Sequence, residues 1–118
     1  MAANPARPAS GTALIEAAKI KRGEAVVLDF AQGDAAYSLI VAHGEAGYVA
    51  YENVCPHADA PLERFDGQVL TQEKRYIVCA MHGASFRIDD GECVGGPALG
   101  MCLTPAPIHV EDGIVRLK

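Results

Sequence analysis

The sequence predicts an all-β protein, built as an antiparallel sandwich or a small barrel. Short runs rich in β-branched and aromatic residues recur at close, regular intervals along the 118 residues. Turn-forming Gly and Asp residues separate these runs. Near the C-terminus an Asp-Gly pair at 112–113 divides two apolar runs, and this is a pair that tight hairpin turns prefer.

The predicted strands extend from the first third of the chain to its end. They are Ala25–Phe30, Tyr37–Ala42, Tyr48–Tyr51, Arg75–Val78, Ser85–Ile88, Glu92–Val94 and a hairpin over Ile108–Leu117. The one helical candidate is the segment from Leu14 to Ile20. We expect residues 1–12 to form a flexible tail, so the folded domain should span 13–118.

Composition and charge narrow the classes of function. A chain of 118 residues, half of them hydrophobic, suits one domain whose core needs no disulfides. The net charge of −5 argues against a nucleic-acid partner, because phosphate binding needs a basic face. No apolar run approaches membrane-spanning length, and the N-terminus lacks the apolar stretch of a signal peptide. We therefore expect a cytoplasmic protein with free thiols and no membrane partner.

Two short motifs carry the chemistry. Cys55-Pro56-His57 and Cys79-Ala80-Met81-His82-Gly83 each contain one Cys and one His, and together they form the pattern C-x-H-x21-C-x2-H. Each Cys follows a predicted strand, so both motifs are expected in loops, where a rigid scaffold presents a site. Pro56 stiffens the first loop by fixing its φ, and Gly83 allows a close backbone approach in the second.

This spacing resembles that of the Rieske iron–sulfur family, in which two Cys bind one iron of a [2Fe–2S] cluster and two His bind the other. The resemblance implies one such cluster, with Cys55 and Cys79 on one iron and His57 and His82 on the other. Neutral imidazoles in place of two thiolates make a cluster less negative, so it accepts an electron more readily.

The resemblance also implies a Rieske-type fold, an antiparallel β-sandwich base with a small cluster-binding subdomain at about 53–96. The stretch Gly95-Gly96-Pro97 is similar to the family's third loop, which covers the cluster and limits water access.

The chain differs from the high-potential members of the family. Those proteins carry an extra Cys in each cluster loop, joined as a disulfide, where this chain has Ala60 and Met81. They also carry a Ser and a Tyr that donate hydrogen bonds to cluster sulfurs, where this chain has Ala84 and Phe86. Each missing donor disfavours reduction. The chain therefore resembles the soluble, low-potential Rieske-type ferredoxins.

A structural zinc site is the main alternative for this ligand set, since two Cys with two His commonly bind zinc. Zinc spacings, however, usually pair Cys with Cys and His with His. A mixed pair in each half favours a site with two metals.

The remaining Cys and His residues are expected to be structural. Cys93 and Cys102 could pair with each other, but in a reducing compartment we expect two buried free thiols. His43 and His109 occur in turn and strand contexts and are expected to stabilise the fold.

The implied function is that of a single-electron carrier without a catalytic site of its own. Its reductant would be a reductase with flavin or another iron–sulfur centre, and its acceptor a terminal oxygenase or a comparable redox enzyme. Two alternatives remain: the small subunit of an assimilatory nitrite reductase, or a redox-sensing binding module. The 21 residues between His57 and Cys79 are expected to form a solvated hairpin, with a partner-specific surface as the alternative.

Overall fold

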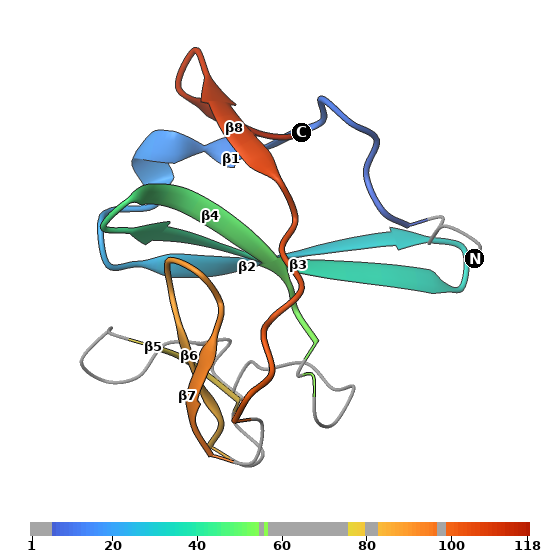
Figure 1. Cartoon of the computed structure of the whole chain (residues 1–118). Coiled ribbons are helices and arrows are strands. Elements are labelled where there is room, and N and C mark those ends of the chain that lie inside the picture. Colours follow the sequence, from blue (N-terminus) through green and yellow to red (C-terminus); the bar gives the residue numbers. More distant parts are fainter. Residues whose placement is uncertain (1–5, 55, 57–75, 80–82, 97–98) are drawn as a thin grey trace.

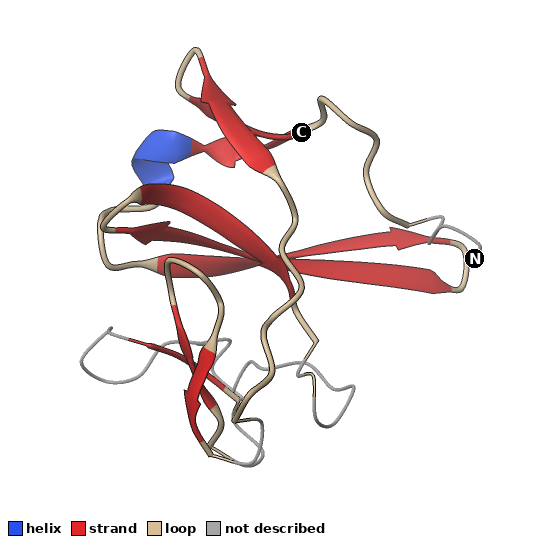
Figure 2. Cartoon of the chain, viewed as in Figure 1, coloured by secondary structure: helices blue, strands red, loops and turns tan. Residues whose placement is uncertain are grey.

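The computed structural model describes residues 6–54, 56, 76–79, 83–96 and 99–118. Almost all regular structure in these residues is strand, and the one helical element there is a 3₁₀ turn, η1 (Ala17–Lys19) (Figure 2). The strands are β1 (Ala13–Glu16), β2 (Ala25–Gln32), β3 (Ala35–Gly44), β4 (Gly47–Glu52), β5 (Tyr76–Val78), β6 (Ser85–Arg87), β7 (Cys93–Gly95), β8 (Ile108–Glu111) and β9 (Ile114–Leu117). None of the described helical structure is long and apolar enough to cross a membrane.

The described strands form three antiparallel sheets of three strands each, in the orders β2-β3-β4, β1-β9-β8 and β5-β6-β7. Figure 1 shows β2–β4 across the middle of the molecule, with β1 and β8 above them and β5–β7 below. We call β1–β4, β8 and β9 the base, and β5–β7 the small sheet. The predicted all-β antiparallel fold is confirmed.

Strand β3 supplies side chains to two separate cores. Leu39 and Val41 are fully buried in a core that also contains Val115 from β9. Ile40, between them, is buried in a second core shared with the small sheet. Because successive side chains of a strand point to opposite faces, a strand covered on both faces has to be apolar throughout this stretch.

The C-terminal hairpin forms as predicted. Glu111 of β8 pairs with Ile114 of β9, which leaves a two-residue turn. Asp112 and Gly113 occupy that turn with φ values of 53° and 76°. A type I′ hairpin turn requires positive φ at both central positions, and Asp-Gly adopts this conformation at little cost.

The helix predicted from Leu14 to Ile20 is wrong. Residues 13–16 form β1, in which Ile15 pairs with Val115 of β9. The helical part is only the three residues of η1, closed by a hydrogen bond from the Ile20 N–H to the Ala17 carbonyl at 3.1 Å. A helix this short has little stability of its own in water, so pairing with a strand about a hundred residues away determines the structure here.

The described part of the predicted tail, residues 6–12, packs on the base. Ala6 is buried, and the Gly11 N–H donates to the Leu117 carbonyl at 2.7 Å. Residues 1–5 lie outside the described residues.

Tyr51 joins the small sheet to the base. It lies in β4, and its hydroxyl donates to the Ile88 carbonyl just beyond β6, at 2.7 Å. Its ring packs against Gly91, where a Cβ would lie only 2.7 Å from a ring carbon. Burial raises the pKa of Tyr51 far above its ordinary value, so the hydroxyl stays a neutral donor. A second polar contact runs from the Ala46 N–H to the Asp89 carboxylate, at 3.3 Å.

Candidate metal centre

The structure places one of the four predicted ligands, Cys79. Cys55, His57 and His82 lie outside the described residues. Among the described residues no three His, Cys, Asp or Glu side chains converge as a metal site, so the ligand set stays a prediction. The described chain before the first motif, and on either side of the second, nevertheless shows how these segments are held.

The second motif continues a hairpin of the small sheet. Cys79 directly follows β5 and is fully buried. Its N–H donates to the Ala84 carbonyl at 2.9 Å, and the Gly83 N–H donates to the Cys79 carbonyl, also at 2.9 Å. Gly83 has a φ of 74°, which an L residue rarely adopts. The loop between Cys79 and Gly83 is therefore closed at its base by two main-chain hydrogen bonds.

The first motif follows a buried amide. Asn53, two residues before Cys55, is 2% exposed. Its main-chain N–H donates to the Ser38 carbonyl at 2.9 Å, and its side-chain amide donates to the Ser38 hydroxyl at 3.1 Å. These two bonds fix the chain to β3 immediately before the first predicted ligand. Sequence reasoning did not single out Asn53, although a polar residue between a strand and a ligand motif is a usable signal.

The third predicted loop lies against the second. A Cβ added to Gly96 would be 2.8 Å from the Ala84 Cα and 3.1 Å from the Gly83 carbonyl oxygen. Gly96 also has a φ of 89°. Only glycine satisfies both conditions, so Gly96 allows the predicted third loop to pack directly on the main chain of the second. Pro97 lies outside the described residues.

The wall behind Cys79 is apolar. Ala84 and Phe86, which carry no hydroxyl, are fully buried and belong to the same core as Cys79. The neighbouring Ser85 hydroxyl contacts the Gly83 carbonyl at 3.4 Å. The described surroundings of Cys79 therefore exclude water and offer few hydrogen-bond donors.

The other Cys and His predictions hold in part. Cys93 and Cys102 are both free. Cys93 is buried as expected, whereas Cys102 is exposed, which corrects the prediction that it is buried. Cys102 lies in a segment that runs along the outer edge of β7, bridged to Glu92, where a side chain can face solvent. His43 stacks on Tyr48, with ring centroids 4.1 Å apart, in a structural role.

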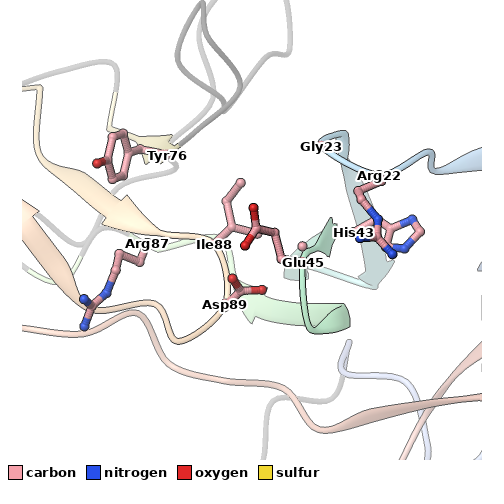
Figure 3. A pocket seen from close by; sticks show the side chains of 9 residues that line it. Arg22, Gly23, His43, Glu45, Tyr76, Arg87, Ile88 and Asp89 are labelled. Carbon is pink, nitrogen blue, oxygen red and sulfur yellow. The ribbon is translucent and has the colours of Figure 1, made fainter.

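A cavity of about 360 Å³ lies between the base and the small sheet. In Figure 3, Arg22 and His43 stand on one side of it, and Tyr76 and Arg87 on the other. Arg87 is already paired, because Asp90 and Glu92 lie 2.9 and 2.6 Å from its guanidinium. A main-chain hydrogen bond from Glu92 and the Arg87 guanidinium hold the pKa of Asp90 below its usual range. Cys79 is not among the described residues that line this cavity.

Comparison with known proteins identifies the family. The family model of the Rieske [2Fe–2S] domain matches residues 11–107. The chain therefore belongs to this family, and its cofactor is the family's [2Fe–2S] cluster rather than zinc. No curated protein sequence matches the chain.

Solved structures of ferredoxins match nearly the whole chain. The Sphingomonas yanoikuyae B1 ferredoxin is 27% identical, with a TM-score of 0.67 over 92% of this chain and 98% of its own. The ferredoxin of carbazole 1,9a-dioxygenase from Nocardioides aromaticivorans IC177 is 19% identical, with a TM-score of 0.69 over 92% and 97%. A chain from a complex of reduced oxygenase and oxidised ferredoxin in carbazole 1,9a-dioxygenase is 21% identical, with a TM-score of 0.65 over 91% and 100%. The family match and the likeness to the 27% identical ferredoxin together support a Rieske-type ferredoxin that carries electrons.

Proposed function

We propose that this Rieske-family chain carries single electrons from a flavin- or iron–sulfur-containing reductase to a terminal oxygenase or a similar redox enzyme. The main support is the Rieske family match together with the likeness to ferredoxins, one of which occurs in a complex with an oxygenase. A cytoplasmic location is part of the same proposal.

The proposed ligands are Cys55 and Cys79 for one iron and His57 and His82 for the other. Cys79 fits this role, because its thiol is buried and two main-chain hydrogen bonds close its loop at the base. Thiolates are the usual protein ligands of iron–sulfur clusters, and imidazoles replace two of them in Rieske centres. The bound cluster would accept and release one electron.

The surrounding residues would keep the centre rigid and dry. Asn53 fixes the approach to the first loop, and Gly96 brings the third loop onto the backbone of Ala84. The apolar wall of Ala84 and Phe86 excludes water from one side. A rigid site changes little in shape when its charge changes, which favours rapid electron exchange.

The test is to purify the protein anaerobically and measure iron, acid-labile sulfide and the number of electrons taken up. We expect equal amounts of iron and sulfide, in the ratio of one [2Fe–2S] cluster per chain, and uptake of one electron per chain. The reduced protein should then reduce a terminal oxygenase. One zinc per chain without sulfide would contradict the cluster assignment. A cluster that exchanges electrons slowly with every reductase offered would instead favour a redox sensor.

A further inference from the structure

A carboxylate is held just before the first predicted ligand motif. Glu52 ends β4, three residues before Cys55. Its N–H donates to the Thr104 carbonyl at 2.9 Å, and its own carbonyl accepts the Val54 N–H at 2.8 Å. Because hydrogen bonds hold the main chain on both sides of Glu52, the direction in which its side chain leaves the strand is fixed.

The Glu52 side chain is in turn bound by a buried tyrosine. The hydroxyl of Tyr37, which lies in β3, donates to the Glu52 Oε2 at 3.0 Å. Burial, together with the neighbouring carboxylate, raises the pKa of Tyr37 to about 12. The hydroxyl therefore stays a neutral donor near neutral pH. It orients the carboxylate without removing its negative charge.

An arginine of the N-terminal segment reaches the same hydroxyl. Ala6 and Tyr37 are buried in one core. The guanidinium of the next residue, Arg7, forms a hydrogen bond with the Tyr37 hydroxyl and opposes the rise in its pKa. One hydroxyl thus contacts a guanidinium and a carboxylate. A segment that the sequence predicted as a flexible tail therefore brings a positive charge to the end of β4.

Glu52 is close enough to the candidate centre to act on it through its charge. Three residues of fully extended chain span at most about 11 Å, which is the upper limit for the distance between the Cα atoms of Glu52 and Cys55. At such distances a charge fixed at the edge of an apolar core still acts on a redox centre, because bulk water and salt screen it only in part. Its negative sign opposes the addition of an electron.

We propose that Arg7, Tyr37 and Glu52 form a charge-compensated trio that sets the reduction potential of the cluster from outside its ligand set. Glu52 lowers the potential, Arg7 offsets part of this effect, and Tyr37 holds the two charges at a fixed separation. The proposal rests on the proposed function, in particular on Cys55 as an iron ligand. It deepens that function by assigning positioning residues that control how readily the carrier accepts its electron.

The alternative is that the trio only stabilises the fold. Exposed ion pairs usually contribute little, and the Arg7 end of the trio is exposed. The two interpretations differ in the sign of what they predict. If the trio serves folding alone, removing either charge loosens the same region and shifts the potential in one direction or not at all. If it tunes the cluster, removing Arg7 and removing Glu52 shift the potential in opposite directions.

The test is a redox titration of the holoprotein in solution, followed by its visible spectrum, on a double-mutant cycle. Glu52→Gln keeps an acceptor for the Tyr37 hydroxyl and should raise the potential by about 30 mV, which is about a threefold change in the equilibrium constant for reduction. Arg7→Gln should lower the potential by a similar amount, and the double variant should return close to the wild-type value. In a Tyr37→Phe background Arg7→Gln should shift the potential less, because nothing then holds its guanidinium beside the carboxylate.

Glu111→Gln is the matched control. It removes the same charge from β8, at the end of the molecule away from the small sheet (Figure 1). There the Glu111 carboxylate lies 3.6 Å from the Arg116 guanidinium, so the control also breaks an ion pair. We expect it to leave the potential unchanged.

Three outcomes would overturn the proposal: equal shifts in Glu52→Gln and Glu111→Gln, shifts of the same sign in Glu52→Gln and Arg7→Gln, or an Arg7→Gln shift that Tyr37→Phe does not reduce. If Glu52→Gln loses the cluster, Arg7→Gln still decides the sign, because it changes an exposed side chain. Unchanged potentials with an intact spectrum would overturn this proposal alone. A wild-type protein without a cluster spectrum would overturn the proposed function, and this proposal with it.

Discussion

The base and the small sheet differ in the length of their strands and in the regularity of their pairing. In the base, β2 and β3 have 8 and 10 residues and pair without interruption from Ala25↔Ala42 to Gln32↔Ala35. In the small sheet, β5, β6 and β7 have 3 residues each, and a bulge interrupts the β6–β7 register. The base can be stabilised by its own ladder and apolar core, whereas three-residue strands are too short for this.

This difference shows where the molecule depends on tertiary contacts. The small sheet is attached to the base through Tyr51, the Asp89 carboxylate and a shared apolar core. Its two loop ends meet where Gly96 touches Ala84. A cluster that binds both ligand loops would act as a further cross-link in the weaker region, because metal binding is coupled to folding.

The largest effect should come from removing a ligand. Cys79→Ala should abolish cluster binding, since one iron loses a thiolate and becomes open to water. Iron, sulfide and the visible spectrum should all be lost, while the far-ultraviolet circular dichroism of the base persists. Cys102→Ala is the matched control, because Cys102 is an exposed free thiol outside the motif, and it should retain the cluster. Collapse of the whole fold in Cys79→Ala would show that the base is not independent.

A pair of glycine substitutions should separate backbone strain from crowding. Gly113 and Gly91 have φ values of 76° and 72°, so alanine at either costs about 1–2 kcal/mol of unfolding free energy. At Gly113 no atom lies within 4 Å of the added Cβ, whereas at Gly91 the Tyr51 ring lies 2.7 Å away. Gly91→Ala should therefore cost about 1–3 kcal/mol more. Equal losses of unfolding free energy in the two variants, measured with denaturant, would mean that the Tyr51 ring moves aside at little cost.

Removing either of two tyrosine hydroxyls, one in the base and one between the base and the small sheet, should have a smaller effect. The Tyr48 hydroxyl donates to the Ala17 carbonyl at 2.8 Å within the base, and the Tyr51 hydroxyl donates to the Ile88 carbonyl at 2.7 Å across to the small sheet. Each change to Phe should cost about 1 kcal/mol of unfolding free energy, because it removes one hydrogen bond to a main-chain carbonyl. Only Tyr51→Phe should also speed the release of iron to a chelator. Equal release rates in the two variants would remove Tyr51 from this role.

The smallest effect should be on the reduction potential. With Ala84 and Phe86 in place of hydroxyl donors, we expect a potential of roughly −150 to 0 mV, in the lower part of the range of Rieske centres. Ala84→Ser with Phe86→Tyr should raise it, provided that the new hydroxyls reach the cluster sulfurs. Protein-film voltammetry gives the value directly. An unchanged potential with an intact cluster would show that exposure rather than these hydrogen bonds controls it.

Local sequence signals predicted the base better than the contacts around the site. The β-branched runs and the Asp112-Gly113 turn carry their structure within a few residues, so these strands were predictable. The segment from Leu14 to Ile20 was not, because β9 determines its pairing. The hydrogen bond between Tyr51 and Ile88 joins residues 37 positions apart, and no local sequence pattern predicts such a contact. The ligand pattern was visible because C-x-H and C-x2-H are local motifs, but the positions of Cys55, His57 and His82 lie outside the described residues.

The most direct test of the central claim is electron paramagnetic resonance of the dithionite-reduced protein, with and without ¹⁵N-labelled histidine. If Cys55 and Cys79 bind one iron and His57 and His82 the other, the electron resides on the iron with the neutral imidazoles, which carries less ligand charge. The account predicts a signal with low average g and hyperfine couplings to two histidine nitrogens, both changed by the label. A signal without histidine coupling, or no signal from a protein that contains zinc, would contradict it.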